Sequence, residues 1–109
     1  MFYKLYYLTW YNIRMEVSIV TINYNSSEYT IKLVNSILKK ISCNTEYEII
    51  ITDNASKEDD YNNLIDKLPS DKRIRIFRSS INTGFAGGNM NGYKESSGKY
   101  LLFINNDCE

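Results

Sequence analysis

The chain has 109 residues, of which 43% are hydrophobic and 14% aromatic, so it can build one modest core and is too short for two ordinary domains. Lys plus Arg and Asp plus Glu both number 13, which leaves no global charge to hold a nucleic acid or an anionic membrane surface. The absence of histidine excludes the commonest general base and most zinc sites, so any bound metal must be held by oxygen.

Residues 1–14 are aromatic but interrupted by polar and charged side chains. They are too short and polar for a membrane span, and they lack the small-residue cleavage site of a signal peptide. We interpret them as a leader, an extension of the gene model, with the domain at 15–109. A peripheral aromatic anchor at a membrane surface is the alternative. Cys43 and Cys108 lie far apart in sequence, which favours a reducing cytoplasm, or its inner membrane face if the anchor exists.

From residue 16 onwards, strands and helices alternate along the chain. The β-branched run at 17–22 predicts a buried parallel strand. The polar residues that follow form a turn cluster, and its last member, Ser27, is a good N-cap for a helix. This helix has one apolar stripe at helical spacing, made of Thr30, Val34, Ile37, Leu38 and Ile41.

Two further strands flank a second helix. A continuous apolar run predicts a strand at 47–52, and the alternation of charged and apolar residues at 73–77 predicts a strand with one wet side near the sheet edge. Ser56 and Asp59 resemble a capping box that starts the intervening helix, which Pro69 ends. The helix is expected to turn Leu64, Ile65 and Leu68 inward.

The segment 82–92 is rich in glycine and predicts a loop that runs into a helix ending near Gly98. Such a loop would let the backbone approach a phosphate, and the following helix N-terminus would favour its negative charge. The spacing is neither G-x-G-x-x-G nor a Walker loop, which weakens the alternative of dinucleotide binding. A last strand is predicted at 100–104, followed by the polar residues 105–107.

This alternation predicts an α/β fold: a Rossmann-like parallel sheet with helices on both faces and the strand order three, two, one, four. The chain reverses direction between the first and fourth strands, and such a switch point leaves a ligand crevice at the carboxyl ends of the strands. Polar clusters at 23–25, 53–54 and 105–107 are all expected to meet there.

Two carboxylates in these clusters carry specific chemistry. Asp53 follows a buried strand, where it can accept hydrogen bonds from a base or a ribose; the alternative is a cap for the second helix. Asp107 ends a run of hard oxygen donors. Mg²⁺ or Mn²⁺ beside a diphosphate needs only one or two such protein ligands. The alternative for this run is a polar turn after a strand.

Four motifs occur in the order VTINYNS, TDNAS, NTGFAGGNMNG and NND. As a set, over residues 16–109, they resemble the N-terminal half of family 2 glycosyltransferases of the GT-A type, especially the rhamnosyltransferase-like subgroup. The resemblance implies a UDP- or dTDP-linked sugar donor, a divalent cation, and inverting transfer to an acceptor hydroxyl that the sequence does not identify. It also implies a role in cell-surface polysaccharide biosynthesis.

The resemblance assigns roles residue by residue. Asp107 would bind the cation, and Asn105 stands where the family's Asp-x-Asp motif usually starts with Asp. We name no catalytic residue, because the general base of the family lies in a later half, and we expect the chain to be inactive alone. The rival functions are a nucleotide-binding module without transferase activity and a dinucleotide-dependent oxidoreductase. The expected nucleotide-sugar-binding residues are Asn23, Tyr24, Asp53, Asn54, Gly84, Asn89, Asn105 and Asn106.

Overall fold

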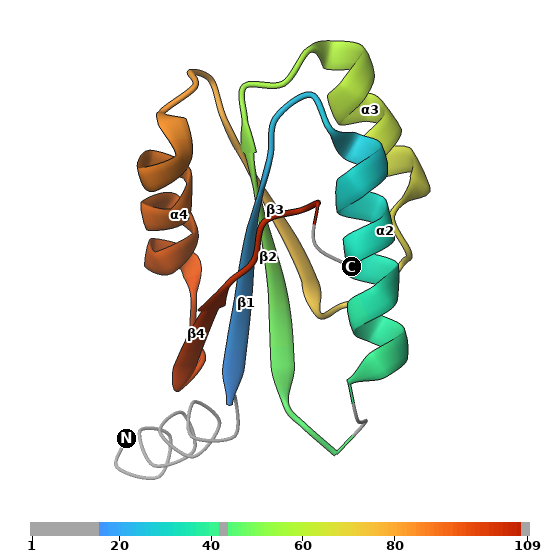
Figure 1. Ribbon diagram of the computed structural model, residues 1–109, viewed down its shortest axis with the longest axis vertical. Helices are drawn as coiled ribbons and strands as arrows, with labels where there is room; N and C mark the ends of the chain where they lie inside the picture. The colour runs from blue at the N-terminus through green and yellow to red at the C-terminus, as the bar shows by residue number, and fades with distance from the viewer. Residues whose placement is uncertain (1–15, 42–43, 108–109) are drawn as a thin grey trace, which may run out of the picture.

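The computed structural model describes residues 16–41 and 44–107 (Figure 1). They form a four-stranded sheet of order β3-β2-β1-β4, in which every pair of neighbours is parallel. The predicted fold class and strand order are confirmed. The leader, Met15 and both cysteines lie outside the described residues. The elements are β1 (Val17–Asn23), α2 (Ser27–Lys40), β2 (Tyr47–Asn54), α3 (Glu58–Lys67), β3 (Ile74–Ser79), α4 (Gly84–Glu95) and β4 (Tyr100–Phe103).

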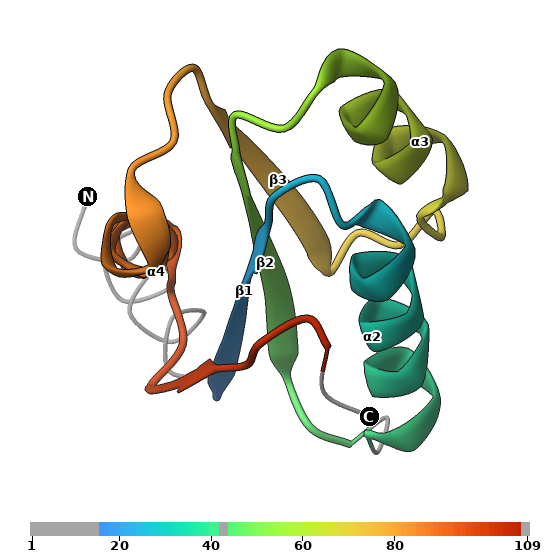
Figure 2. The same ribbon diagram turned by 45° about the horizontal axis from the view of Figure 1, so that its top comes forward.

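Helices cover both faces of the sheet, as predicted. Figures 1 and 2 show α2 and α3 side by side on one face and α4 alone on the other. Every residue of β2 is buried, because this strand has neighbours on both sides and helices above and below. The core lies between the sheet and the α2–α3 layer, where Ile49 and Ile51 pack with Val34 and Leu64.

The starts of α2 and α3 differ from the predicted serine caps. Neither helix has a side-chain hydrogen bond from its own N-cap residue. Instead Asp60 of α3 accepts a hydrogen bond from the Ser27 amide at the start of α2, at 3.0 Å. Ser56 turns toward Asp53 rather than forming the expected box with Asp59, because a buried carboxylate is the stronger acceptor. Ile65, expected to face inward, is 47% exposed.

The glycine-rich segment, predicted as a loop that runs into a helix ending near Gly98, is already helical from Gly84 and its helix ends at Glu95. Its glycines serve packing against the sheet. A Cβ added at Gly92 would lie 2.2 Å from Val20 Cγ1, and one at Gly88 would lie 2.7 Å from Ile22 Cδ1. Helix propensity disfavours glycine by about 1 kcal/mol per residue, but the close approach of α4 to β1 requires it.

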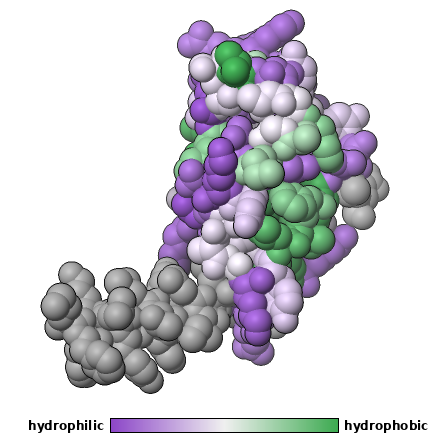
Figure 3. Space-filling view, turned by 90° about the vertical axis from the view of Figure 1, so that its left-hand side faces the viewer, coloured by the Kyte–Doolittle hydropathy of each residue, from purple (hydrophilic) through white to green (hydrophobic). Residues whose placement is uncertain are grey.

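Strand β4 lies at the sheet edge beside β1, and its pairing continues past Phe103 through a bond from the Ile104 amide to the Val20 carbonyl. All four of its residues are exposed, from 37% at Leu101 to 61% at Tyr100. Figure 3 shows the face that carries α4 and β4, where hydrophobic side chains gather in one area beside polar ones. Strand β3 forms the other edge of the sheet and is partly exposed, in agreement with the strand predicted near the sheet edge with one solvent-facing side.

Candidate functional site

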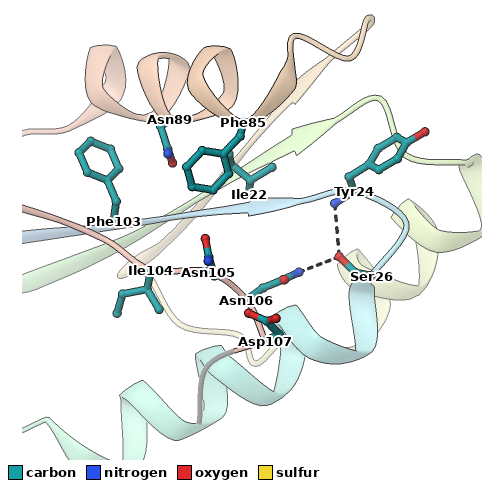
Figure 4. A pocket seen from close by; sticks show the side chains of 10 residues that line it. All are labelled: Ile22, Tyr24, Ser26, Phe85, Asn89, Phe103, Ile104, Asn105, Asn106 and Asp107. Atoms are coloured by element: carbon teal, nitrogen blue, oxygen red, sulfur yellow. Dashed lines mark hydrogen bonds between the residues drawn. The ribbon is translucent and has the colours of Figure 1, made fainter.

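A cavity of about 330 Å³ opens at the carboxyl end of the sheet, where the chain switches direction between β1 and β4. Its walls come from the turn after β1, the first half of α4 and the segment that follows β4 (Figure 4). This is the crevice expected at a topological switch point. The lining residues are Ile22, Tyr24, Ser26, Phe85, Asn89, Phe103, Ile104, Asn105, Asn106 and Asp107.

Five residues predicted for the site therefore share one cavity: Tyr24, Asn89, Asn105, Asn106 and Asp107. Figure 4 shows Asn89 projecting from α4 toward the segment that carries Asn105, with open space between them. Exposed aromatic rings add apolar contact surface, since Tyr24 is 50% and Phe85 64% exposed. The cavity thus combines aromatic and aliphatic surface with convergent polar groups, which is the kind of lining that binds and orients a small molecule.

Asn106 is fixed to α2 on the floor of this cavity. Its Nδ2 donates to Ser26 Oγ at 2.6 Å and to Thr30 Oγ1 at 3.1 Å. The Ser26 oxygen also accepts from the Tyr24 amide at 3.4 Å, so one serine joins two walls of the cavity (Figure 4). These bonds hold the segment bearing Asp107 against the start of α2.

Asn23 and Asp53 are both fully buried, beneath the loops that follow β1 and β2. The Asn23 Nδ2 donates to Asp53 Oδ1 at 2.8 Å and lies 3.0 Å from Asp60 Oδ2. Burial acts to raise the pKa of the Asp60 carboxyl, but hydrogen bonds donated by the Ser27 backbone and by Asn23 outweigh it, so the pKa is lowered. Asp60 therefore stays ionised and ties α2 to α3.

The Asp53 carboxylate is occupied by the protein itself. It accepts from Ser56 Oγ at 2.7 Å and from the Ser56 amide at 3.1 Å, and Arg78 Nε lies 3.5 Å away. Ser56 precedes α3, so Asp53 holds the turn and does not cap the helix. Asp53 borders a separate cavity of about 220 Å³ beside Arg78 and Lys94. Its direct bond to a base or ribose stays a prediction.

Asn54 and Gly84 position the start of α4. The Asn54 Oδ1 accepts from the Thr83 amide at 3.0 Å, and its Nδ2 donates to the Gly84 carbonyl at 2.9 Å. Gly84 has φ +76°, a left-handed conformation that glycine adopts without strain. The first turn of α4, with Phe85, is thereby set at the mouth of the large cavity.

Comparison with known proteins identifies the family of this chain. Residues 18–109 match the model of the glycosyl transferase family 2. The chain belongs to this family. It is 36% identical over 92 residues to an uncharacterised glycosyltransferase of Rickettsia bellii, covering 84% of this chain and 13% of the relative. It is 28% identical over 94 residues to the poly(ribitol-phosphate) beta-N-acetylglucosaminyltransferase TarS of Staphylococcus aureus, covering 85% and 16%.

The family 2 chain also resembles a solved structure of S. aureus TarS, residues 1-349, in complex with UDP-GlcNAc. The TM-score is 0.71 at 25% identity, over 85% of this chain and 27% of that one. The GT-A type of fold expected from the motifs is confirmed by this match. The chain spans less than a quarter of the curated relatives it matches. Within the described ranges, no helix is long and apolar enough to cross a membrane.

Three polar residues that contact the buried pair Asn23 and Asp53 were not selected by the sequence analysis. Thr30 was assigned to the apolar stripe of its helix, and Asp60 was given no role. Arg78, which stacks 4.1 Å over the Tyr61 ring beside Asp53, lies just beyond the strand predicted at 73–77. A sequence signal exists only for Thr30, a hydroxyl within an otherwise aliphatic stripe.

Candidate oxygen ligands for a divalent cation lie in the segment that follows β4. Across residues 16–41 and 44–107 no group of three or more His, Cys, Asp or Glu side chains gathers as a metal cluster. Among the described residues, Asp107 is the only acidic one that lines the cavity between β1, α4 and β4, and it is exposed, as is Asn105 in the same wall. One carboxylate and one amide oxygen suit Mg²⁺ or Mn²⁺ when a diphosphate and water complete the shell.

Proposed function

We propose that this chain is the donor-binding part of a glycosyltransferase and holds a nucleoside diphosphate sugar, UDP- or dTDP-linked, in the cavity between β1, α4 and β4. The observation that carries the proposal is the gathering of Tyr24, Asn89 and the 105–107 segment around one cavity in a family 2 chain. The likeness to TarS, whose structures hold UDP-GlcNAc and UDP, supports a nucleotide-sugar donor.

The cavity offers a distinct contact for each part of such a donor. Tyr24 and Phe85 provide aromatic surface for the apolar faces of a base or a sugar ring. The first turn of α4 lines the cavity with the positive end of its helix dipole, which favours a diphosphate. Asp107, with Asn105, would hold a divalent cation. A bound cation would offset the negative charge that develops on the departing diphosphate.

The acceptor hydroxyl and the general base that deprotonates it are proposed to meet this site from parts of a longer protein. The only acid lining the cavity is Asp107, which is assigned to the cation, so we name no base among the described residues. We therefore expect the 109 residues to bind donor without transferring sugar. Inverting transfer, a role in cell-surface polysaccharide biosynthesis and a cytoplasmic location remain part of the proposal. The two separated cysteines support that location.

Calorimetric titration of the chain with UDP, dTDP and NAD, each with and without Mn²⁺, tests this function. We expect UDP or dTDP to bind, and Mn²⁺ to strengthen that binding by about tenfold, as expected for a cation shared between protein and diphosphate. NAD should bind much more weakly than either. Preference for NAD would identify a dinucleotide-binding domain, and failure of all three to bind would remove the donor site.

A further inference from the structure

We propose that Thr30, a residue of α2 that does not line the cavity, positions the two ends of the donor site relative to each other through its hydroxyl. The inference rests on the proposed function, because it concerns how the 105–107 segment and the buried pair Asn23 and Asp53 act together. Thr30 is fully buried between them. Its role is that of a positioning residue, since it would touch no ligand.

A continuous line of side-chain hydrogen bonds crosses the site through Thr30. Asn106 Nδ2 lies 3.1 Å from Thr30 Oγ1, and Thr30 Oγ1 lies 2.6 Å from Asn23 Oδ1. From Asn23 the line continues to Asp53 Oδ1 at 2.8 Å. Four side chains from four elements or their flanking segments are thus joined, from the wall that holds Asp107 to the carboxylate behind β2.

All the donors in this line point the same way. A threonine hydroxyl has one proton and two lone pairs, so Thr30 donates to the side-chain oxygen Oδ1 of Asn23 and accepts from the side-chain amide of Asn106. The bond to Thr30 orients the Asn23 amide with its nitrogen toward the carboxylate of Asp53. Hydrogen bonds aligned in this manner polarise one another, and buried networks respond as units.

Movement at one end should therefore be felt at the other. If donor and cation draw the 105–107 segment toward the cavity, Asn106 pulls on Thr30, and the orientation of Asn23 against Asp53 follows. Without the hydroxyl, Asn106 would still be held by Ser26, but the buried Asn23 oxygen would lose its donor.

The variant Thr30→Val removes the hydroxyl at nearly constant shape, and Thr30→Ser keeps it. We expect Thr30→Val to weaken binding of UDP or dTDP about tenfold and Thr30→Ser to stay within about threefold of the wild type. Thr52→Val is the matched control, because Thr52 is also buried and donates to the Gly88 carbonyl, off this line of bonds. Equal weakening by Thr52→Val, or none by Thr30→Val, would overturn the proposal.

A double-mutant cycle separates coupling from plain destabilisation. The ligand for this cycle is the nucleoside that matches the diphosphate found to bind, uridine for UDP or thymidine for dTDP. A nucleoside has no phosphate group that could reach the cation, so its binding does not depend on the cation. Asn106→Ala should weaken nucleoside binding severalfold in the wild-type background and by a clearly smaller factor in the Thr30→Val background, where only the bond to Ser26 and the cavity contact remain to be lost. The same loss in both backgrounds would mean that Asn106 acts without Thr30, which would refute the coupling.

The coupling can also be read in the ligand-free chain, so its failure is distinguishable from failure of the donor site. Asn106→Ala should shift the side-chain amide NMR signals of Asn23, and the shift should be absent when Thr30 is Val. If neither UDP nor dTDP binds but this shift is seen, the proposed function fails and the Thr30 line of bonds stands. If the Asn23 side-chain amide signals do not shift on Asn106→Ala, the line of hydrogen bonds through Thr30 is refuted.

Discussion

Single residues in this site divide into those that face the cavity and those that hold it in shape. Tyr24, Asn89 and Asp107 line the cavity, whereas Asn23 and Asp53 are fully buried and bonded to protein groups. The two groups answer differently to substitution. A lining residue can be changed at little cost to stability, but a buried hydrogen-bonded residue leaves unpaired partners behind, at about 1–3 kcal/mol for each group.

Asp107→Asn is the sharpest test at the residue scale. The change keeps the size and hydrogen-bonding reach of the side chain and removes its charge, so the strengthening of UDP or dTDP binding by Mn²⁺ should largely disappear, a loss of about tenfold. Stability should change little, because Asp107 is exposed. Titration calorimetry with and without Mn²⁺ measures this effect, and an unchanged enhancement would return the segment to an ordinary polar turn.

Asp53→Asn is the comparison for this measurement. It should weaken nucleotide binding equally with and without Mn²⁺. Because Asp53 accepts bonds from Ser56 and Asn23, the variant should also lose about 1–3 kcal/mol of stability, so thermal melting must accompany the titration.

Elements in this protein are placed by close contacts more than by their own caps. The clearest case is α4, whose low apolar periodicity and several glycines argue against a stable helix in isolation. Its position depends on Gly88 and Gly92 lying directly against β1. The helix in turn delivers Phe85 and Asn89 to the cavity.

Gly92→Ala should destabilise the chain, although alanine is the better helix former by about 1 kcal/mol. The new methyl group would meet Val20, a stiff β-branched side chain, and the overpacking should cost more than the propensity gains, for a net loss of about 1–2 kcal/mol. Urea denaturation reads the change. Met90→Ala on the exposed side of α4 is the control and should lie within about 0.5 kcal/mol of the wild type.

A double-mutant cycle of Gly92→Ala with Val20→Ala tests whether the contact with Val20 causes this loss of stability. Removing the opposing methyl groups should make Gly92→Ala nearly neutral. A loss that persists in the Val20→Ala background would mean that backbone conformation, not the contact with β1, requires glycine at this position.

At the scale of the whole molecule, the open side of the sheet is the main feature. Tyr100, Leu101, Leu102 and Phe103 are all exposed on an edge strand. Exposed edges with apolar side chains promote association. The curated relatives are several times longer than this chain.

We expect the isolated chain to be marginally stable and to self-associate as its concentration rises. Size-exclusion chromatography with light scattering measures the association, and Leu102→Lys, which places a charge on the edge strand, should reduce it. A sharply monomeric wild type with a cooperative melt would contradict the expectation.

Deleting residues 1–14 should leave the fold intact, because the strand and helix pattern begins after Met15. The melting temperature of the shortened chain should lie within about 4 °C of the full chain, which corresponds to less than roughly 1 kcal/mol. A large drop would show that the aromatic leader packs on the domain.

The sequence by itself determined the order of elements, the parallel sheet and the meeting of polar clusters near one edge. These follow from local pattern: β-branched runs, helical spacing and the handedness of crossovers are readable without knowing what packs on what. Tyr24 and residues 105–107 could be placed together for the same reason, since strand ends in one sheet share an edge, whereas Asn89 was selected through the family resemblance.

Only the tertiary structure decided which polar residues face the cavity and which are buried with their polar groups hydrogen-bonded to the protein. Asp53, Asn54 and Asn23 carry the same chemical groups as the lining residues, but they form hydrogen bonds with partners 30 or more residues away in the sequence. Likewise the glycines of α4 suggested a loop, because propensity is local, and only contact with Val20 and Ile22 explains a helix there. Thr30 joins two distant segments, and its hydroxyl gains that role only where they meet.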